Sequence, residues 1–499
     1  MISKIKSATL VGIDAILIDV EIDSKRGLPT EHIVGLPDTI IKESKARIKT
    51  AIRNSGFEYP LRQYTINLAP ADLPKEGAYF DLPIALGLLL CNNQITLPND
   101  MIIIGELSLD GDIKPVKGII AIAEMASKTA SKKLIIPYEN RDETRLINNI
   151  DIYPIKSLKD ILTMTFDTPY KEKKQPTNVI TPHPLNYKDV KGQMIGKRTM
   201  EIAAAGQHNI LLIGPPGCGK SMLLHRLPSI IPPPTQQEQI EILKIQSICK
   251  HIYSKNLEIK RPFQTPHHTI SYAGLVGGGR KPLPGEISLA HNGILFLDEL
   301  PEFNRQSLEV LREPLESKEI TITRSNQSIT YPANFLLVAA MNPCPCGFAT
   351  DPVIECTCSP NEKKKYLTKL SGPLLDRFDI ILEIPRLKKS EFTKDSKDEE
   401  SSEQIYKRVE KCIEKQINRY KNHQKNGTIS IQILNKFTKL SSNQKELLGT
   451  CIEQGILTAR SCNKIIRVAQ TLSDLENTDS IKDHHLTEAM QYRQTLFKN

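Results

Sequence analysis

The stretch Gly214-Pro215-Pro216-Gly217-Cys218-Gly219-Lys220-Ser221 matches the phosphate-binding pattern G-x-x-x-x-G-K-[ST] at every fixed position. The apolar run from Ile210 to Ile213 precedes it, and a helical start from Ser221 to Arg226 follows. In a strand, loop and helix of this kind, backbone N–H groups turn inward and the positive end of the helix dipole attracts phosphate oxygens. We therefore expect a nucleotide-binding loop, with Lys220 at the β- and γ-phosphates and Ser221 on Mg²⁺. The alternative is a glycine loop that arose by chance.

Two later apolar runs end in polar side chains that suit the same chemistry. Asp298 and Glu299 follow the run from Ile294 to Leu297, and Asn342 follows the run from Phe335 to Ala340. We expect Asp298 to bind Mg²⁺ through water and Glu299 to orient or activate the attacking water. Asn342 is then placed to contact the γ-phosphate or that water. Otherwise the acidic pair caps a helix and Asn342 is a turn residue before a proline.

Two arginines are candidates for completing the site. Arg377 stands just before the apolar run from Asp379 to Glu383, where a guanidinium can reach a nucleotide held by a neighbouring subunit and act as an arginine finger. The alternative is a salt bridge with Asp376 or Asp379. Arg460 opens a helix late in the chain and is a candidate second sensor, or else an exposed arginine at a helix start.

The composition is that of an ordinary protein large enough for about three domains. The net charge of +9 and the pI near 8.8 permit a polyanionic partner without requiring one. We find neither a signal peptide nor an apolar run of the ~18–20 residues that a membrane span needs, so we expect a cytoplasmic protein with no membrane contact. Ten cysteines in that compartment indicate thiols or metal ligands rather than disulfides.

Composition shifts divide the chain into an α/β domain over 1–167, a charged and proline-bounded linker over 168–184, and a nucleotide-binding domain over 185–387. Continuous apolar strands separated by helices predict a parallel sheet covered on both faces. A helix over Lys197 to Ala205 is expected to stop at Gly206. Residues 388–403 read as a flexible linker, and 404–499 as a helical domain of four-helix scale. Within 1–167 we expect strands over 15–22, 64–68, 101–109 and 134–137, and helices over 40–54 and 82–90.

Four cysteines stand in two C-x-C pairs, Cys344-Pro345-Cys346 and Cys356-Thr357-Cys358. Tetrahedral zinc takes four soft ligands brought together by short loops. We expect zinc here, although C-x₂-C is the commoner spacing, and four free thiols are the alternative. The run Lys363 to Lys365 that follows is either a contact to DNA phosphates or a solvated face. His267 and His268 are expected to make hydrogen bonds rather than to bind metal.

These features together resemble the AAA+ ATPases, and within them the magnesium-chelatase-like group. The matching stretches are Arg261 to Thr269 (RPFQTPHHT), Pro284 to Gly293 (PGEISLAHNG) and Ala340 to Cys344 (AMNPC). Over nearly its whole length the chain resembles the ComM/YifB family of competence-associated ATPases. That resemblance implies an AAA+ P-loop core, a C-terminal helical lid of magnesium-chelatase type, and a ring, expected to be a hexamer, with nucleotide sites between subunits.

Two insertions in the nucleotide-binding domain are candidates for contacting DNA. Lys318 to Thr323 and Gln327 to Tyr331 alternate with period two, which predicts a β-hairpin with Arg324 at its tip. Related helicase-like AAA+ proteins carry a pore-facing hairpin at this place, where the arginine would contact phosphate. The glycine-rich segment before it resembles a pore loop and supplies Arg280 and Lys281. Without the family, a surface hairpin with a solvated arginine is the default interpretation.

Residues 1–167 resemble the catalytic fold of Lon protease, through the stretch from Leu73 to Asp81. In active Lon-like proteases the nucleophilic serine would fall near Tyr79, where this chain has none, and Lys117 corresponds to the lysine base. Without a hydroxyl nucleophile, acyl transfer has no starting atom. We expect a ring-building or DNA-handling platform with no peptidase activity.

The family resemblance implies an ATP-driven DNA motor that promotes branch migration where incoming single-stranded DNA invades a chromosome during natural transformation. Its partners would be single-stranded or branched DNA and a recombinase. The first alternative is a chelatase-type ATPase motor that drives Mg²⁺ into a porphyrin. The Lon-like part and the cysteine pairs argue against it, because the chelatase motor is expected to resemble only the middle and end of this chain. The second alternative, an ATP-dependent protease, is disfavoured by the missing serine.

Overall fold

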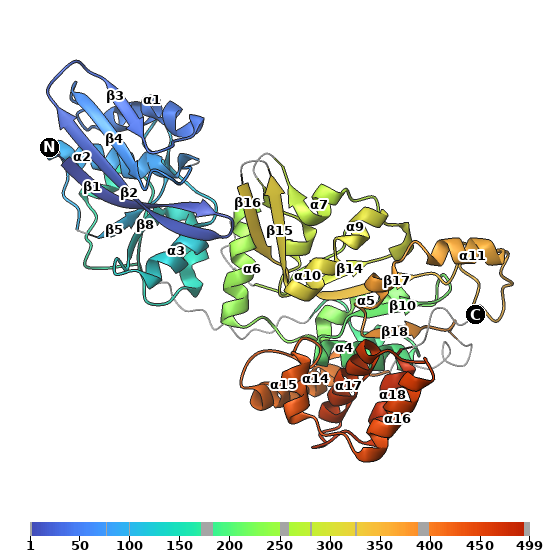
Figure 1. The fold of residues 1–499 in the computed structure, drawn as a ribbon. Coiled ribbons are helices and arrows are strands. Elements are labelled where there is room, and N and C mark those ends of the chain that lie inside the picture. Colours follow the sequence, from blue (N-terminus) through green and yellow to red (C-terminus); the bar gives the residue numbers. More distant parts are fainter. Residues whose placement is uncertain are drawn as a thin grey trace. The chain divides into compact units, whose positions relative to one another are not determined.

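The computed structural model describes residues 2–75, 77–98, 100–170, 183–249, 259–279, 282–324, 327–387 and 399–493. They form two compact units (Figure 1). Unit 1 comprises Met1–Asn178, Thr235–Lys260 and Thr323–Tyr331, and unit 2 comprises Val179–Pro234, Arg261–Ile322 and Pro332–Asn499. The division of the chain at 167, 184, 387 and 403 stays a prediction. No helix in the described ranges is both long and apolar enough to cross a membrane.

Unit 1 is built on a seven-stranded mixed sheet with the order β3-β4-β2-β1-β5-β8-β9. Its centre is antiparallel: β1 (Ile2–Val11) pairs with β2 (Asp14–Lys25), and β2 pairs with β4 (Gln63–Ala69). The remaining strands run parallel to their neighbours; they are β3 (Glu31–Val34), β5 (Met101–Ile103), β8 (Lys133–Pro137) and β9 (Asp151–Ile155). A separate ribbon joins β6 (Glu106–Leu107) to β7 (Ile113–Lys114).

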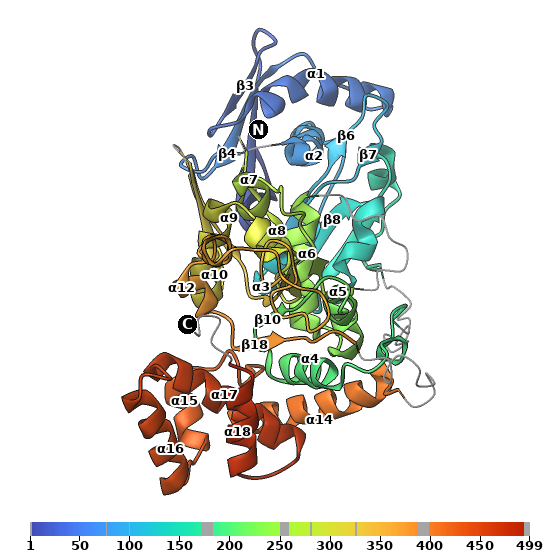
Figure 2. The same cartoon turned by 90° about the vertical axis from the view of Figure 1, so that its right-hand side faces the viewer.

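Helices cover both faces of this sheet (Figure 2). On one face, α1 (Thr39–Asn54) and α2 (Asp81–Cys91) share a hydrophobic core with the strands. On the other, α3 (Ile119–Lys128) shares a second core with β1, β5 and β8. The carboxylate of Asp38 accepts the backbone N–H of Ile41 and so caps the start of α1. Three 3₁₀ turns complete the unit: η1 (Ala78–Phe80), η2 (Tyr138–Leu146) and η3 (Leu158–Leu162).

Helix α6 (Gln236–Cys249) stands in the nucleotide-binding part of the sequence but belongs to unit 1. The Nζ atom of its Lys244 lies 2.6 Å from Asp14 Oδ1 and 2.9 Å from Glu124 Oε2. Its apolar face, with Ile240 and Leu243, packs against Ile120 of α3. The sequence order alone does not predict this placement, because it follows from complementary surfaces far apart in the chain.

Five of the six expected segments in 1–167 coincide with β2, α1, β4, α2 and β8. The sixth, 101–109, was expected to be a single strand and is divided into β5 and β6 at Gly105. A Cβ at Gly105 would lie 3.0 Å from Ile113 Cγ2 and from Leu82 Cδ2. The backbone therefore packs closely against these two side chains at the place where the strand is interrupted. Strand β1 was not expected, although it lies at the centre of the sheet.

Unit 2 contains a five-stranded parallel sheet with the order β11-β14-β17-β10-β18. The strands are β10 (Ile210–Ile213), β11 (Phe263–Gln264), β14 (Ile294–Leu297), β17 (Leu336–Met341) and β18 (Ile380–Glu383). Apart from β11 and Glu383 these strands are buried throughout, which explains their continuous apolar sequences. The expected parallel-sheet core is therefore confirmed.

Short helices and turns surround this sheet. They are η4 (Tyr187–Asp189), α4 (Met194–Gly206), α5 (Lys220–His225), η5 (Leu227–Ile230), α7 (Tyr272–Val276), α8 (Glu286–Leu289), η6 (Leu300–Glu302), α9 (Arg305–Glu309), α10 (Arg312–Ser317), α11 (Pro360–Leu367) and α12 (Gly372–Leu375). Helix α4 ends at Gly206, as expected, although Gly206 itself does not adopt the left-handed conformation. Gln207 does so, with φ of 57°, and Gly206 is instead required by close packing, because a Cβ there would lie 2.6 Å from Thr471 Oγ1.

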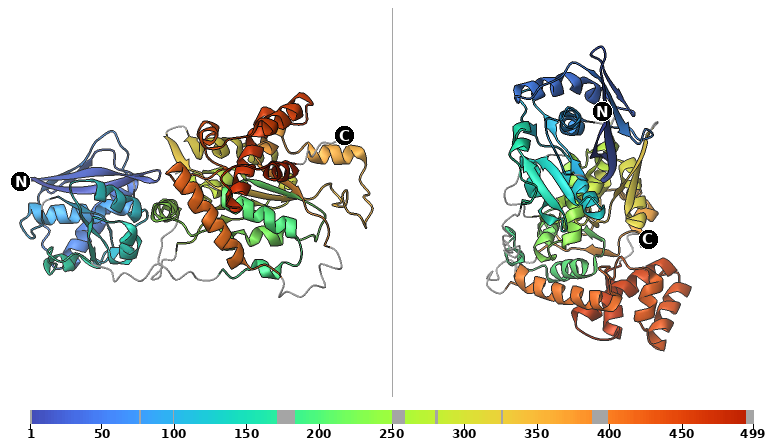
Figure 3. Two further views of the ribbon diagram at one scale, coloured as in Figure 1. Left: turned by 90° about the horizontal axis from the view of Figure 1, so that it is seen from below. Right: turned by 90° about the vertical axis from the view of Figure 1, so that its left-hand side faces the viewer.

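The C-terminal part of unit 2 is helical, as expected, with α14 (Ser402–Tyr420), α15 (Ile431–Phe437), α16 (Ser442–Glu453), α17 (Ala459–Leu475) and α18 (Asp483–Gln491). Figure 3 shows α14 running beside α4, and one hydrophobic core joins α4, the sheet, α14, α17 and α18. Of the expected flexible linker, 388–398 lies outside the described residues. Residues 399–403 are packed instead, because the Glu399 carboxylate pairs with buried Lys197 and accepts the backbone N–H of Gly192.

The two expected insertions differ: the hairpin forms a small ribbon, whereas the glycine-rich segment, which was expected to be a loop, begins within helix α7 (Tyr272–Val276) and continues into a second ribbon. β15 (Glu319–Arg324) pairs with β16 (Gln327–Pro332), which confirms the hairpin, and β12 (Gly277–Gly278) pairs with β13 (Leu283–Pro284). Arg280 and Lys281 lie outside the described residues. Of Arg324 only the backbone, at the end of β15, is described.

Candidate nucleotide-binding site

The phosphate-binding loop connects β10 to α5 at the carboxyl edge of the parallel sheet. Gly217 and Gly219 have φ of 74° and 93°, values that favour glycine. A Cβ at either residue would have no described atom within 4 Å, so it is the backbone conformation that requires glycine there. Gly214 differs, because a Cβ there would collide with the carbonyl oxygen of Ile384. The glycines thus serve two purposes, an inward-turned loop and close contact with the end of β18.

Lys220 is the most constrained side chain of the loop and is only 8% exposed. Its Nζ atom donates to the carbonyl oxygens of Gly214 at 2.6 Å and Pro215 at 3.0 Å, and to Asn342 Oδ1 at 3.2 Å. Burial lowers the pKa of Lys220. The three oxygens that accept from it are neutral, and Cys218 and Asp298 offset the lowering of its pKa only in part. A phosphate oxygen brought into the loop would therefore stabilise the buried ammonium further. The structure therefore brings together Lys220 and Asn342, which are 122 positions apart.

Ser221 and Asp298 form the acidic side of the same site. Ser221 Oγ donates to Asp298 Oδ2 at 2.8 Å, from the first turn of α5 to the end of β14. A hydroxyl and a carboxylate at this distance are the oxygen ligands that Mg²⁺ takes in P-loop proteins. The backbone N–H of Glu299 donates to the other oxygen of Asp298 at 2.9 Å, which fixes the carboxylate. These residues fit a magnesium ion beside the phosphate loop.

Glu299 is held in the left-handed conformation, with φ of 52°, and is exposed. The Nδ1 atom of His268 lies 3.5 Å from Glu299 Oε2, while His267 Nδ1 lies 2.9 Å from Thr269 Oγ1. Both histidines therefore make polar contacts, as expected. The sequence did not predict that one of them faces the candidate catalytic glutamate, because the segments that carry residues 268 and 299 are brought together by the pairing of β11 with β14.

The two candidate arginines contact acidic residues of their own chain. Arg377 Nη2 pairs with Glu316 at the end of α10, not with Asp376 or Asp379 as its alternative role assumed. Arg460 Nη1 lies 3.8 Å from Asp376 Oδ2, and Arg493 Nη2 lies 3.2 Å from Asp376 Oδ1. The ion-pair partners of Arg377 and Arg460 thus lie outside the phosphate-binding loop.

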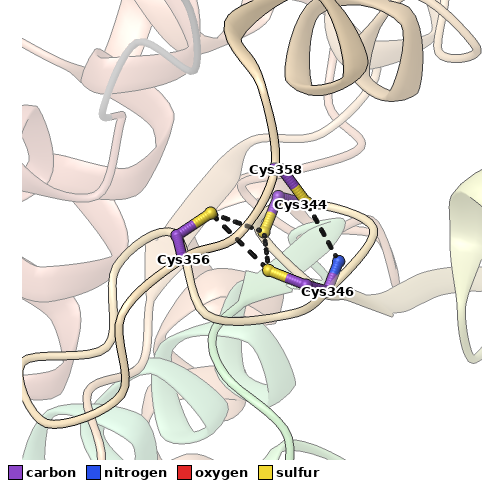
Figure 4. Close-up of side chains that lie close together, drawn as sticks. All are labelled: Cys344, Cys346, Cys356 and Cys358. Carbon is purple, nitrogen blue, oxygen red and sulfur yellow. Dashed lines mark hydrogen bonds between the residues drawn. The ribbon is translucent and has the colours of Figure 1, made fainter.

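The four cysteines of the two C-x-C pairs converge on one point (Figure 4). The sulfur of Cys344 lies 3.3 Å from that of Cys346 and 3.7 Å from that of Cys356, and the sulfurs of Cys346 and Cys356 are 3.5 Å apart. All four sulfurs lie within 4.8 Å of one another. Tetrahedral zinc with Zn–S bonds of about 2.3 Å would place them about 3.8 Å apart, so the residues fit a zinc ion.

Backbone amides surround these sulfurs in the way that suits thiolates. The backbone N–H of Cys346 donates to Cys358 Sγ at 3.3 Å. The backbone N–H of Phe348 lowers the pKa of Cys346 to about 5, whereas burial raises that of Cys344 to about 12. Such donors commonly support metal-bound thiolates.

In unit 1, the two residues compared with a Lon active site occupy ordinary structural positions. Tyr79 lies in η1, and its carbonyl oxygen accepts the backbone N–H of Gly105 at 3.2 Å. Lys117 precedes α3, and its Nζ atom donates to the carbonyl oxygen of Cys249 at 3.1 Å. The lysine amine is therefore bound by the end of α6.

Comparisons with known proteins give a consistent picture. A family model described as magnesium chelatase, subunit ChlI, matches residues 186–392; one described as subunit ChlI of Mg-chelatase matches 20–140; and one described as its C-terminal part matches 399–493. We expected the chelatase motor to resemble only the middle and end of this chain. The match to 20–140 shows that a family model with a chelatase description also covers the N-terminal part.

Individual relatives cover the whole chain. The YifB protein of Escherichia coli is 42% identical over 99% of this chain and 97% of its own length. The competence protein ComM of Haemophilus influenzae is 38% identical over 98% of this chain and 96% of its own length. Lon protease 2 of Bacillus subtilis is 29% identical over 27% of this chain and 25% of its own length, a likeness to the N-terminal part.

Proposed function

The chain belongs to the magnesium-chelatase-like AAA+ family that contains YifB and ComM, and from this premise we propose that it is an ATP-driven DNA motor that promotes branch migration. The observation that carries the proposal is that Lys220, Ser221, Asp298 and Asn342 meet at one edge of the sheet. They do so in a chain that is similar over nearly its whole length to a competence protein. The motor acts in the cytoplasm, on single-stranded or branched DNA that enters recombination during natural transformation, together with a recombinase.

In this proposal the loop 214–221 binds ATP, and Ser221 and Asp298 hold Mg²⁺. When bound there, Mg²⁺ would supply positive charge beside the phosphates. Glu299, exposed beside that edge, takes the proton of the attacking water, and His268 at 3.5 Å orients its carboxylate. Asn342 hydrogen-bonds the γ-phosphate or the water while it positions Lys220. Each of these roles uses a side chain on the carboxyl edge of the sheet.

The chains assemble into a homo-hexamer in which Arg377 serves as an arginine finger and Arg460 as a second sensor. The side chain of Arg460 supports this, because it is 60% exposed beside Asp376 and is therefore available to a nucleotide. The side chain of Arg377 is only 12% exposed, so it has to part from Glu316 to reach the nucleotide of a neighbouring copy. The hairpin β15–β16, with Arg324, and the glycine-rich loop, with Arg280 and Lys281, contact the DNA backbone. The four cysteines bind zinc as a second metal cofactor.

The test is ATP turnover and strand exchange by the purified protein. We expect DNA to raise ATP turnover several-fold, and the protein with ATP and Mg²⁺ to extend a synthetic three-strand joint. Lys220→Ala, which removes the lysine at the β- and γ-phosphates, is the control and should do neither. A protein that hydrolyses ATP but is indifferent to every form of DNA would refute the proposal.

A second candidate is a chelatase-type motor, which the family matches to 20–140, 186–392 and 399–493 favour because all three carry chelatase descriptions. The same experiment separates the two, since a chelatase motor would hydrolyse ATP without a response to DNA. Stimulation by a porphyrin-binding partner and not by DNA would decide for this second function.

A further inference from the structure

The turn that carries the first cysteine pair lies directly against the phosphate-binding loop. The backbone N–H of Gly347 donates to the Cys344 carbonyl at 3.0 Å, which closes a turn around Pro345 and Cys346. A Cβ at Gly347 would lie 2.7 Å from Cδ of Pro216, the third residue of the loop. Only a residue without a side chain allows this approach, and Gly347 also has φ of 87°. The cysteine turn is therefore a wall of the phosphate-binding loop.

The other end of the cysteine segment returns to the same place. After Cys358, helix α11 brings the buried side chain of Tyr366 to the end of β17. Burial raises the pKa of Tyr366, and the backbone N–H of Asn342, which faces its hydroxyl, opposes the rise. Asn342 in turn accepts from Lys220. The segment 342–366 thus begins and ends at the residue that positions the loop lysine.

A third contact holds the middle of the segment. Asp351, whose side chain is fully buried, lies with Oδ2 3.2 Å from Nε of Arg386, just after β18. Between these anchors the segment has little regular structure, since only α11 at its end is helical. Without a metal ion the four cysteines would hold it weakly, because S–H groups are poor hydrogen-bond donors. A metal ion bound by four thiolates would cross-link residues 344–346 to 356–358.

We propose that the four cysteines bind one zinc ion and that this zinc centre holds Gly347 against Pro216 and Asn342 against Lys220, so that removal of zinc weakens ATP binding. The inference rests on the proposed function only in taking ATP as the ligand of the loop. Gly347 is a positioning residue that acts through Pro216. The centre transmits its effect through the contact of Gly347 with Pro216 and the hydrogen bond of Lys220 with Asn342, and it takes no part in phosphate chemistry.

Zinc content and ATP affinity, both measured without DNA, test the proposal. We expect about one zinc per wild-type chain and, in the double variant Cys356→Ser/Cys358→Ser, loss of zinc with roughly tenfold weaker binding of a fluorescent ATP analogue. Val353→Ser is the matched control, because Val353 lies between the two pairs and is 74% exposed; it should keep both zinc and affinity. Since the double variant can fail to fold, zinc is also removed from wild-type protein with a metal chelator. Reloading this protein with zinc should restore its affinity for the ATP analogue.

A glycine pair separates metal binding from positioning. Gly347→Ala should keep its zinc yet bind the ATP analogue several-fold more weakly, because the new methyl group collides with Pro216. Gly455→Ala is the control, since Gly455 also has a positive φ, 69°, but a Cβ there would meet no described atom within 4 Å. Wild-type protein purified without zinc, or zinc-free protein that binds the analogue as tightly as wild type, overturns the inference. Neither result bears on whether DNA stimulates ATP turnover. Conversely, a failure of DNA to stimulate ATP turnover would not change the measured zinc content or ATP affinity.

Discussion

Lys220 shows how much of the candidate site is decided by single residues. Its ammonium is buried among two loop carbonyls and the amide oxygen of Asn342. The P-loop pattern predicted the place of this lysine, because the pattern reports a local strand, loop and helix. The sequence predicted Asn342 beside the γ-phosphate or the attacking water, and only the structure revealed its hydrogen bond with Lys220.

Glu299→Gln tests the candidate base. Because glutamine has nearly the same shape but cannot accept a proton, we expect ATP to bind as in wild type while hydrolysis falls at least about 100-fold. Single-turnover hydrolysis and filter binding of labelled ATP measure the two quantities. Glu302→Gln, an exposed change three residues later, is the control. Wild-type turnover in Glu299→Gln would contradict the assignment.

Glu143 gives a prediction about pH. It is 2% exposed, burial raises its pKa to about 7, and its Oε2 atom has no hydrogen-bond donor among the described residues. A raised pKa means that the folded state prefers the neutral carboxyl. The stabilisation is therefore complete below the unfolded pKa of about 4.3 and is lost as the pH rises through 7.

Glu143→Gln stays neutral and should avoid this loss. Relative to wild type, we expect the variant to gain stability on the order of 2 kcal/mol between pH 5 and pH 8.5. Melting temperatures of both proteins at the two pH values measure the gain. An exposed change in the same turn, Glu139→Gln, controls for general charge effects. A difference between variant and wild type that is equal at both pH values would count against a neutral Glu143.

At the scale of elements, the buried parallel strands of unit 2 were predictable from the sequence, whereas strand β1 of unit 1 was not. The apolar runs 210–213 and 294–297 coincide with β10 and β14, and 335–340 lies within one residue of β17. A strand buried on both faces must be apolar throughout, so its sequence reports its place. Strand β1 is half polar, with the pattern ISKIKSATLV, and only its pairing with β2 and β5 reveals that it is central.

The packing of α4 against α17 yields a prediction at this scale. A Cβ at Gly206 would collide with His208 and lie 2.6 Å from Thr471 Oγ1, and His208 Nε2 and Thr471 Oγ1 are themselves 2.7 Å apart. Gly206→Ala should therefore destabilise unit 2 by about 1–3 kcal/mol. Gly449→Ala is the matched opposite, because Gly449 lies within α16 and a Cβ there meets no described atom within 4 Å.

For Gly449→Ala we expect a gain of about 0.5–1 kcal/mol, since alanine is the better helix former. Urea unfolding of both variants, followed by hydrogen exchange in α4, α16 and α17, measures the two effects. Equal changes in the two variants would show that close packing at Gly206 is not the cause.

At the scale of the whole molecule, the proposed ring makes a prediction that a single chain cannot satisfy. Arg377→Ala should abolish hydrolysis yet spare ATP binding, because the arginine is proposed to act on a neighbour's nucleotide. Lys220→Ala should bind no ATP but retain its Arg377. Mixing the two inactive variants should restore part of the ATP turnover, since some sites would combine an intact loop with an intact arginine.

The mixed-variant experiment is read from ATP turnover over a range of ratios, with each variant alone as the control. Size measurement by light scattering, with and without ATP, shows whether closed multimers form. If no ratio restores turnover while multimers do form, Arg377 does not act between subunits.

Local pattern was enough to predict the parallel-sheet core, the phosphate loop, the hairpin and the helical C-terminal part, because periodicity and glycine spacing report short-range geometry. Only the tertiary structure showed that α6 belongs to the N-terminal unit and that His268 faces Glu299. It alone also showed that Arg377 pairs with Glu316 and that the cysteine turn contacts Pro216. The reason is physical: contacts between residues far apart in a chain depend on how whole surfaces fit, and no short stretch of sequence contains that information.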